Sequence, residues 1–472
     1  MRRPALRPKP LPLPPRDRMA ARTPAGWSAY LVLAVALAPV VAPALPGNSS
    51  ILDALNVLAL AVFAFVLLTP GRRLHTPLLV PMVLVAVGSL LAALGAPSPQ
   101  KAALAMAQDI YLFVWFVALV NLLRGERDVR LACIVWTAAA VIISGAALGQ
   151  LWARYGTLET LLGSRGLRPT ATFHNPNVLA DYLVMSLFVS TSLFGQVRRR
   201  FLLPAIAVML VGLLATKSNG GMLSLAVGGL AWLVVGAAVS PVRRVLVVAG
   251  TLLVVGLAGL GLWAHREWRV GESLLASLQA HTFAGRMEHS SQSRMRIWDQ
   301  LERAYQRNPL GIGPGNSSAL TLSITDRERP DSYQSKEAHS DYLAYAIERG
   351  PIGLAGLLAL TGAMFVQVHA TWRNRPQRPE RQLANGRWVA AATAALAASA
   401  AHSMVIEKLH FRHFWLLAAL VSASSLIAAR HAERRRSRGA LAVEDEAVEE
   451  FAIVRPARPR LKPAGLLRRA TA

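Results

Sequence analysis

The sequence predicts an all-α protein: a polytopic membrane helix bundle of about twelve transmembrane helices, with a large, partly helical loop between spans nine and ten. Three observations predict this fold class. The chain has 472 residues, of which 53% are hydrophobic and only 16% are charged. Its apolar residues form blocks of about 18–24 residues, close to the length that crosses a bilayer as a helix. Its basic residues, which give a formal charge of +25, fall in short clusters between these blocks, so we expect no nucleic-acid partner.

The amino terminus is basic and rich in proline, and residues 1–26 are predicted to be a disordered cytoplasmic tail. A signal peptide is the alternative, because Ala42-Pro43-Ala44 resembles a cleavage site. The apolar block from Gly26 to Leu45 is longer than a usual signal-peptide core, however. We therefore expect the first span to remain uncleaved.

The predicted spans follow from the apolar blocks and are tested by charge. They occupy residues 27–46, 51–69, 77–95, 102–123, 131–152, 176–195, 201–216, 221–239, 245–264, 351–370, 387–405 and 411–430. With the amino terminus inside, every short inner connection contains arginine, as the positive-inside rule requires. The predicted domains are a basic tail (1–26), spans one to nine (27–264), a large outer loop (265–350), spans ten to twelve (351–430) and a disordered inner tail (431–472).

The large outer loop contains predicted helices. Ile297, Leu301 and Tyr305 repeat at a four-residue spacing typical of one helix face. The following segment, NPLGIGPGNSS, ends this helix with proline and glycine. We interpret its GIGPG as a tight turn rather than a phosphate-binding loop, because no strand precedes it.

Four arginines lie in outer loops, where the positive-inside rule does not call for them: Arg165, Arg168, Arg294 and Arg296. A guanidinium stays charged and can bind phosphate oxygens through two parallel hydrogen bonds, so converging arginines suit a pyrophosphate. The alternative is that these arginines are solvated loop charges that meet acidic lipid head groups.

A helix start follows Arg168. Asn175 is predicted to cap the sixth span, with Pro176 in its first turn and Asn177 beside them. The free backbone N–H groups and positive dipole end of such a helix would favour an anion next to Arg168.

His339 is the candidate base of the outer loop. It is predicted to begin a helix on which Tyr342 shares its face, and a histidine can accept a proton from a hydroxyl near neutral pH. The alternative is a hydrogen bond to loop backbone. The ionisable residues Asp109, Asp181, His402 and Glu407 are expected to support the site, although Glu407 could simply pair with Lys408. We expect no metal site, because neither outer loop spaces His, Asp and Glu as ligands.

Four segments together resemble the O-antigen ligase and O-antigen polymerase family of bacterial membrane glycosyltransferases, and their layout is similar to the ligase branch. They are RPTATFHNPNVLADYL, LLATKSNGGMLSLAVGGL, SRMRIWDQLERAYQRNPLGIGPGN and AHSDYLAYAIERGPIGLAGLLAL, within residues 165–365. The resemblance implies transfer of a glycan from undecaprenyl pyrophosphate to a hydroxyl of lipid A-core oligosaccharide. The enzyme would work without cofactor or metal, as a monomer in the inner membrane, with its active site facing the periplasm.

The resemblance also implies residue roles. Arg168 and Arg294 match positions that hold the pyrophosphate, and His339 matches the histidine that activates the acceptor. The supporting substrate-binding residues are Arg165, Arg296, Asn175, Asn177, Lys217 and Tyr342. Two positions depart from the pattern, since Asn219 stands where Arg is frequent and Ser340 where Asn is common. The first puts a pyrophosphate contact from that turn in doubt, although Lys217 could substitute as a point charge.

The resulting hypothesis is a single displacement that inverts the anomeric centre, with arginines neutralising the leaving group. An O-antigen polymerase or a protein O-oligosaccharyltransferase would use the same donor and differ in acceptor. A transporter or flippase for the lipid-linked glycan is the alternative from another class, although the sequence shows no internal repeat of the kind many transporters have. A catalytically inactive relative is a further alternative, because of Asn219.

Overall fold

The computed structural model describes residues 25–41, 51–67, 74–155, 168–173, 175–237, 298, 301–317, 339–375 and 379–453. Within these ranges the secondary structure is helical, apart from an isolated bridge between Phe194 and Val197. The main helices are α1 (Ala25–Leu37), α2 (Ile51–Leu67), α3 (Leu79–Ala93), α4 (Pro99–Leu122), α5 (Glu126–Tyr155), α7 (Pro176–Thr191), α8 (Arg199–Ala215), α9 (Asn219–Ala237), α14 (Asp341–Arg373), α15 (Pro379–His402) and α16 (Arg412–Ile453). The all-α prediction is thus confirmed for this part of the chain.

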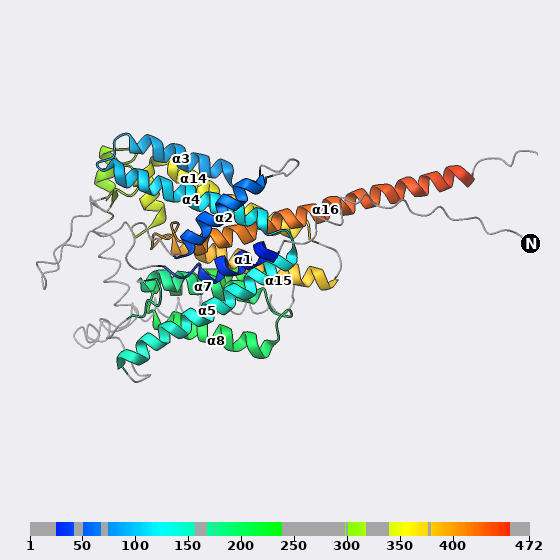
Figure 1. The fold of residues 1–472 in the computed structure, drawn as a ribbon, viewed down its shortest axis with the longest axis horizontal. Coiled ribbons are helices and arrows are strands. Elements are labelled where there is room, and N and C mark those ends of the chain that lie inside the picture. Colours follow the sequence, from blue (N-terminus) through cyan, green and yellow to red (C-terminus); the bar gives the residue numbers. More distant parts are fainter. Residues whose placement is uncertain are drawn as a thin grey trace, which may run out of the picture.

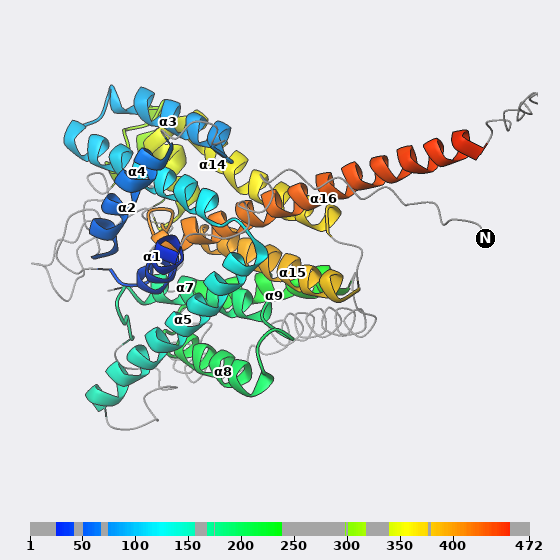
Figure 2. The same cartoon turned by 45° about the vertical axis from the view of Figure 1, so that its right-hand side comes forward.

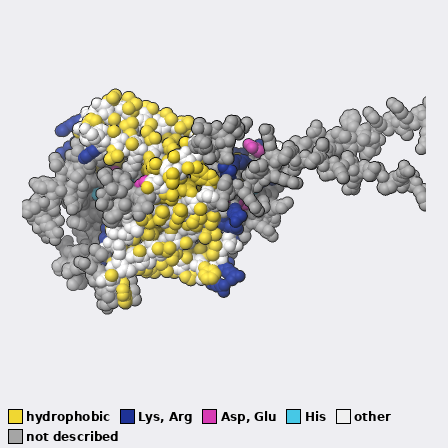
Figure 3. All heavy atoms as spheres, viewed as in Figure 1, with side chains coloured by type: hydrophobic (Ala, Val, Ile, Leu, Met, Phe, Trp, Pro, Cys, Tyr) yellow, Lys and Arg dark blue, Asp and Glu magenta, His cyan; other side chains and the backbone are white. Residues whose placement is uncertain are grey.

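The apolar character of the helices agrees with a membrane protein. Five described helical stretches are long and apolar enough to cross a membrane: Pro99–Leu122, Glu126–Ala153, Asn219–Gly236, Asp341–Arg373 and Arg412–Ser437. Every predicted span except the ninth coincides with a helix, and the ninth, at 245–264, lies outside the described residues. Figure 3 shows hydrophobic side chains covering the middle of the visible face. The total number of spans remains a prediction.

Three helix boundaries differ from the prediction. Helix α1 ends at Leu37, because Pro39 disfavours helical backbone in the residue before it. Helix α14 begins at Asp341, two residues after the predicted start at His339, and continues into the predicted tenth span. Helix α16 continues to Ile453, past residue 431, where the predicted inner tail begins. Its Ala, Glu and Arg residues are strong helix formers that need no core, and α16 extends well beyond the bundle (Figures 1 and 2).

The helices pack in two groups on either side of α16. Helix α14 packs against α3, while α15 packs against α9 and α7, and α5 packs against α8. Helix α16 contacts α14 and α4, and it runs between the two groups in Figure 2. Glycines allow α3 and α14 to approach closely, because a Cβ atom on Gly88 would lie 2.4 Å from the Gly353 backbone nitrogen.

A kink divides α14 into an outer segment and a membrane segment. Gly350 has φ 65° and ψ −170°, and Pro351 follows it. Since proline has no N–H, the Ile347 carbonyl loses its helical partner and accepts a hydrogen bond from the Ile312 N–H at 2.9 Å instead. The kink therefore attaches residues 301–317 to the outer end of α14. Leu301 is buried there against Ile347, and Tyr305 packs beside it, as their predicted shared helix face requires.

Candidate functional site

The candidate site lies at the end of the bundle opposite the one from which α16 extends. The start of α7, the turn between α8 and α9, residues 301–317, the start of α14 and the loop 403–411 all belong to this end. The positive-inside rule predicts that this is the outer end, and it is called so below.

Arg168 is fixed beside the start of α7. Its Nη2 donates a hydrogen bond to Asn177 Oδ1 at 2.7 Å, and its Nε donates to the Thr216 carbonyl at 2.8 Å. Asn175 is the N-cap residue and accepts a hydrogen bond from the Asn177 N–H, with Pro176 in the first turn. The predicted cap is therefore confirmed, and Arg168 does lie beside a helix N-terminus.

The turn between α8 and α9 joins the same cluster. The Ser218 hydroxyl donates to Asn177 Oδ1 at 3.0 Å and accepts from the Gly221 N–H at 3.2 Å, so that it caps α9. Lys217 has a φ of 52°, a conformation that costs a non-glycine residue about 1–3 kcal/mol and is frequent at functional sites. The side-chain oxygen of Asn219 is buried and has no hydrogen-bond partner in the described part of the chain. The structure thus brings Arg168, Asn177 and the Lys217 turn together.

His339 lies just before α14 rather than within it. Ser340 is the N-cap and accepts a hydrogen bond from the Leu343 N–H, so the helix begins two residues later than the sequence predicts. Serine and asparagine cap helices about equally well, so Ser340 keeps this function despite the departure from the family pattern. His339 has a φ of 54°, and its backbone N–H donates a hydrogen bond to Glu407 Oε1 at 3.2 Å.

Tyr342 joins the start of α14 to α15, because its hydroxyl donates a hydrogen bond to the Ala400 carbonyl at 3.1 Å. This contact gives Tyr342 a positioning role at the site.

A buried ionic cluster holds the loop 403–411 against α7. The Lys408 ammonium donates to Asp181 Oδ1 at 2.8 Å and to Ser399 Oγ at 2.9 Å. His402 and His413 each place a ring nitrogen 2.9 Å from the Asp181 carboxylate. Lys408 therefore pairs with Asp181 rather than with Glu407, its neighbour in sequence.

An outer cavity of about 230 Å³ lies between α4, residues 315–317, the start of α14 and the loop 403–411. Its wall carries one arginine, Arg349, and the carboxylates Asp109, Asp341, Glu348 and Glu407. Arg349 and Asp109 form a salt bridge of 2.5 Å. Arg349 was not among the site residues predicted from the sequence, where it lay in the outer loop 265–350 without an assigned function.

The glycine-rich segment 311–317 forms one side of this cavity, and its backbone already binds an anion, the carboxylate of Glu348. The N–H groups of Gly315 and Ser317 donate to the two carboxylate oxygens of Glu348, at 2.9 and 3.0 Å. Gly311, Gly313 and Gly315 all have positive φ, as a tight turn of this kind requires. The segment is thus a turn folded around a carboxylate of the same chain, in agreement with its interpretation from the sequence.

His410 forms part of the cavity wall. Burial lowers the pKa of His410 to about 4, and neighbouring His413 and Arg412 act in the same direction. The imidazole is therefore neutral at physiological pH.

Three predicted site residues, Arg165, Arg294 and Arg296, lie outside the described residues. Within the described ranges, no group of three or more His, Cys, Asp or Glu side chains could hold a metal ion.

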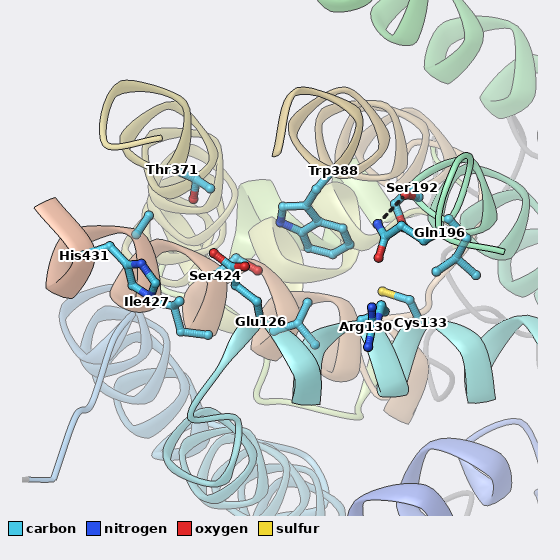
Figure 4. Close-up of a pocket in the computed structure, with 13 residues that line it drawn as sticks. Glu126, Arg130, Cys133, Ser192, Gln196, Thr371, Trp388, Ser424, Ile427 and His431 are labelled. Carbon is cyan, nitrogen blue, oxygen red and sulfur yellow. Dashed lines mark hydrogen bonds between the residues drawn. The ribbon is translucent and has the colours of Figure 1, made fainter. Parts of the chain in front are cut away.

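A second cavity, of about 110 Å³, lies at the opposite end of the bundle (Figure 4). Glu126 and Arg130 from α5, Trp388 from α15 and His431 from α16 line it. Its position at the inner end separates it from Arg168 and His339.

Residues 204–358 match the protein-family model described as O-antigen ligase. The matched segment runs from α8 into α14 and includes both Lys217 and His339. No curated protein matches the sequence significantly. The family resemblance that the four sequence segments indicated is confirmed by this match.

Proposed function

Because residues 204–358 match the O-antigen ligase family model, we propose that the protein is a ligase that moves a glycan from undecaprenyl pyrophosphate to a hydroxyl of lipid A-core oligosaccharide. The reaction takes place at the periplasmic face of the bacterial inner membrane. The observation that carries this proposal is the position of Arg168, which is held at the capped start of α7 at the same end of the bundle as His339.

The diphosphate of the donor binds at the α7 end of the site. Arg168 is the fixed cation, and the starts of α7 and α9 add the positive ends of two helix dipoles. Lys217 adds a second positive charge. In our proposal, the outer loops add further positive charge around the diphosphate through Arg165, Arg294 and Arg296.

The transfer is one displacement. The acceptor hydroxyl oxygen forms a bond to the anomeric carbon of the donor sugar, while the bond from that carbon to the pyrophosphate oxygen breaks. The hydroxyl proton passes to His339, and the electron pair leaves with undecaprenyl pyrophosphate, so the anomeric configuration inverts. The arginines stabilise the charge that develops on the leaving group, and the site's main task is to align the hydroxyl.

Reconstitution with different acceptors tests the proposal. Proteoliposomes with the purified protein and an undecaprenyl-pyrophosphate-linked oligosaccharide would receive lipid A-core, a second lipid-linked glycan or a pilin-like peptide. We expect transfer to lipid A-core, and loss of that transfer in Arg168→Ala. Elongation of the lipid-linked glycan would identify a polymerase, and glycosylation of the peptide a protein oligosaccharyltransferase. Translocation of the donor without covalent transfer would overturn the enzyme assignment.

A further inference from the structure

Two residues that line the outer cavity each have one buried polar atom with no hydrogen-bond partner among the described residues. The first is Oδ2 of Asp341, a residue that is 2% exposed. Its other carboxylate oxygen accepts the N–H groups of Lys408 and Leu409, at 3.0 and 3.4 Å. A buried carboxylate oxygen without a donor is costly. Asp341 is therefore held by one oxygen, while the other is buried at the cavity wall beside Ser403.

The second atom is Nε of Arg349, a residue that is 6% exposed. The Nη1 atom of this guanidinium donates to Ser89 Oγ and Asp109 Oδ2, at 2.6 and 2.5 Å. The plane of the guanidinium is thereby fixed, and its Cζ lies 4.5 Å from the centre of the Tyr345 ring. The cavity thus presents a fixed donor as well as a fixed acceptor.

Charge excludes a diphosphate from this cavity. Four carboxylates and a single arginine line it, and Arg349 is already paired with Asp109. The N–H groups of Gly315 and Ser317, which could have held phosphate oxygens, bind Glu348 instead. An anion would meet a net negative wall at close range.

A hydroxyl group fits both open atoms, because it donates one hydrogen bond and accepts others. A polyol can therefore donate to Asp341 and accept from Arg349 at the same time, with no net charge to desolvate. One water needs only about 10–15 Å³ of such space, so a cavity of about 230 Å³ has room for a sugar ring.

We infer that the outer cavity is the binding site for a sugar of the acceptor, with one sugar hydroxyl donating to Asp341 Oδ2 and another accepting from Arg349 Nε. The description of this sugar as the acceptor's rests on the proposed function. Glu407 connects the cavity to the position of His339, since it lines the cavity and accepts a hydrogen bond from the His339 backbone N–H. The acceptor is thus held on the α4 and α14 side of His339, and the donor diphosphate on the α7 and α9 side.

Binding of a soluble acceptor fragment tests the inference without requiring transfer. The probe is core oligosaccharide released from lipid A by mild acid, titrated calorimetrically into the detergent-solubilised full-length protein. Asp341→Asn keeps the shape of the side chain and one oxygen for the backbone N–H groups, but replaces the open acceptor by a donor. We expect it to weaken oligosaccharide binding at least tenfold. Arg168→Ala should leave oligosaccharide binding unchanged and weaken binding of inorganic pyrophosphate, which Asp341→Asn should not affect.

A second test changes the volume of the cavity and none of its polar contacts, and it has a matched control. Ala105 lines the cavity from α4, whereas Ala107 is exposed on the same helix. Ala105→Leu should therefore weaken oligosaccharide binding, and Ala107→Leu should not. Thermal unfolding of each variant checks that its fold is intact.

Two outcomes would overturn the inference: oligosaccharide affinity unchanged in both Asp341→Asn and Ala105→Leu, or loss of pyrophosphate rather than oligosaccharide binding in these variants. The result also separates this inference from the proposed function. If the protein transfers glycan to lipid A-core but Asp341→Asn leaves the affinity for the oligosaccharide unchanged, only the assignment of the cavity is refuted. If Asp341→Asn weakens oligosaccharide binding but the wild-type protein transfers no glycan, only the ligase assignment is refuted.

Discussion

Replacing Lys408 with methionine removes the charge that balances the buried Asp181. The two side chains are 0% and 2% exposed and lie 2.8 Å apart. At an effective dielectric constant of about 20, unit charges at this separation attract by about 6 kcal/mol, and burial of the two ions offsets much of this gain. Removal of one partner leaves the other charge buried, which costs about 3–5 kcal/mol. Because His402 and His413 still contact Asp181, we expect the lower end, about 3 kcal/mol.

The measurement is the free energy of unfolding of the purified protein in mixed micelles, by titration with sodium dodecyl sulfate and circular dichroism. Lys101→Met is the matched control, because Lys101 is an exposed lysine at the outer end of α4, and it should change stability by no more than about 0.5 kcal/mol. The double variant Asp181→Asn/Lys408→Met should be more stable than Lys408→Met alone, since no charge is then left buried. A Lys408→Met protein as stable as the Lys101→Met control would refute the assignment of this ion pair.

Three further predictions concern the site and the topology. Arg168→Lys removes the planar fork that bridges two acceptors and should raise the KM for the lipid-linked donor roughly tenfold or more, with the KM for the acceptor unchanged; a change in the acceptor KM alone would contradict the donor role. If His339 is the base, activity rises with pH as its imidazole loses its proton, so His339→Gln should lose that limb of the pH–rate profile near neutrality, whereas an unchanged profile would indicate only a backbone contact. Gly95 follows the end of α3, Gly125 precedes the start of α5, and both have open space around them, so a membrane-impermeant maleimide should label Gly95→Cys in intact spheroplasts and Gly125→Cys only after lysis. The chain's own cysteine is buried, and equal labelling of both variants would contradict the predicted orientation.

Local sequence features predicted much of the fold and one half of the candidate site. The apolar blocks gave helices at all described span positions, because crossing a bilayer imposes a minimum apolar length on a short stretch of chain. The Asn175-Pro176 start of α7 was predictable because a helix cap depends on adjacent residues alone. Arg168 and His339 stood out because charged or titratable residues in outer loops are unusual in such a chain.

The other half of the site required the packing of helices that are far apart in sequence. Asp341 resembles an ordinary acidic residue in the first turn of a helix, and only the approach of Lys408 and Leu409 shows that one of its oxygens remains open. Arg349 pairs with Asp109 across 240 residues, which no spacing rule within α14 could indicate.

The sequence by itself determined the helices and their caps, since hydrophobic length and capping act over a few neighbouring residues. The tertiary structure alone decided which buried charges are paired. Lys408 bonds to Asp181 instead of its neighbour Glu407, and the glycine turn encloses Glu348 instead of a phosphate. Each buried charge must find a partner wherever packing places one, and that choice depends on distances in space that a linear sequence does not specify.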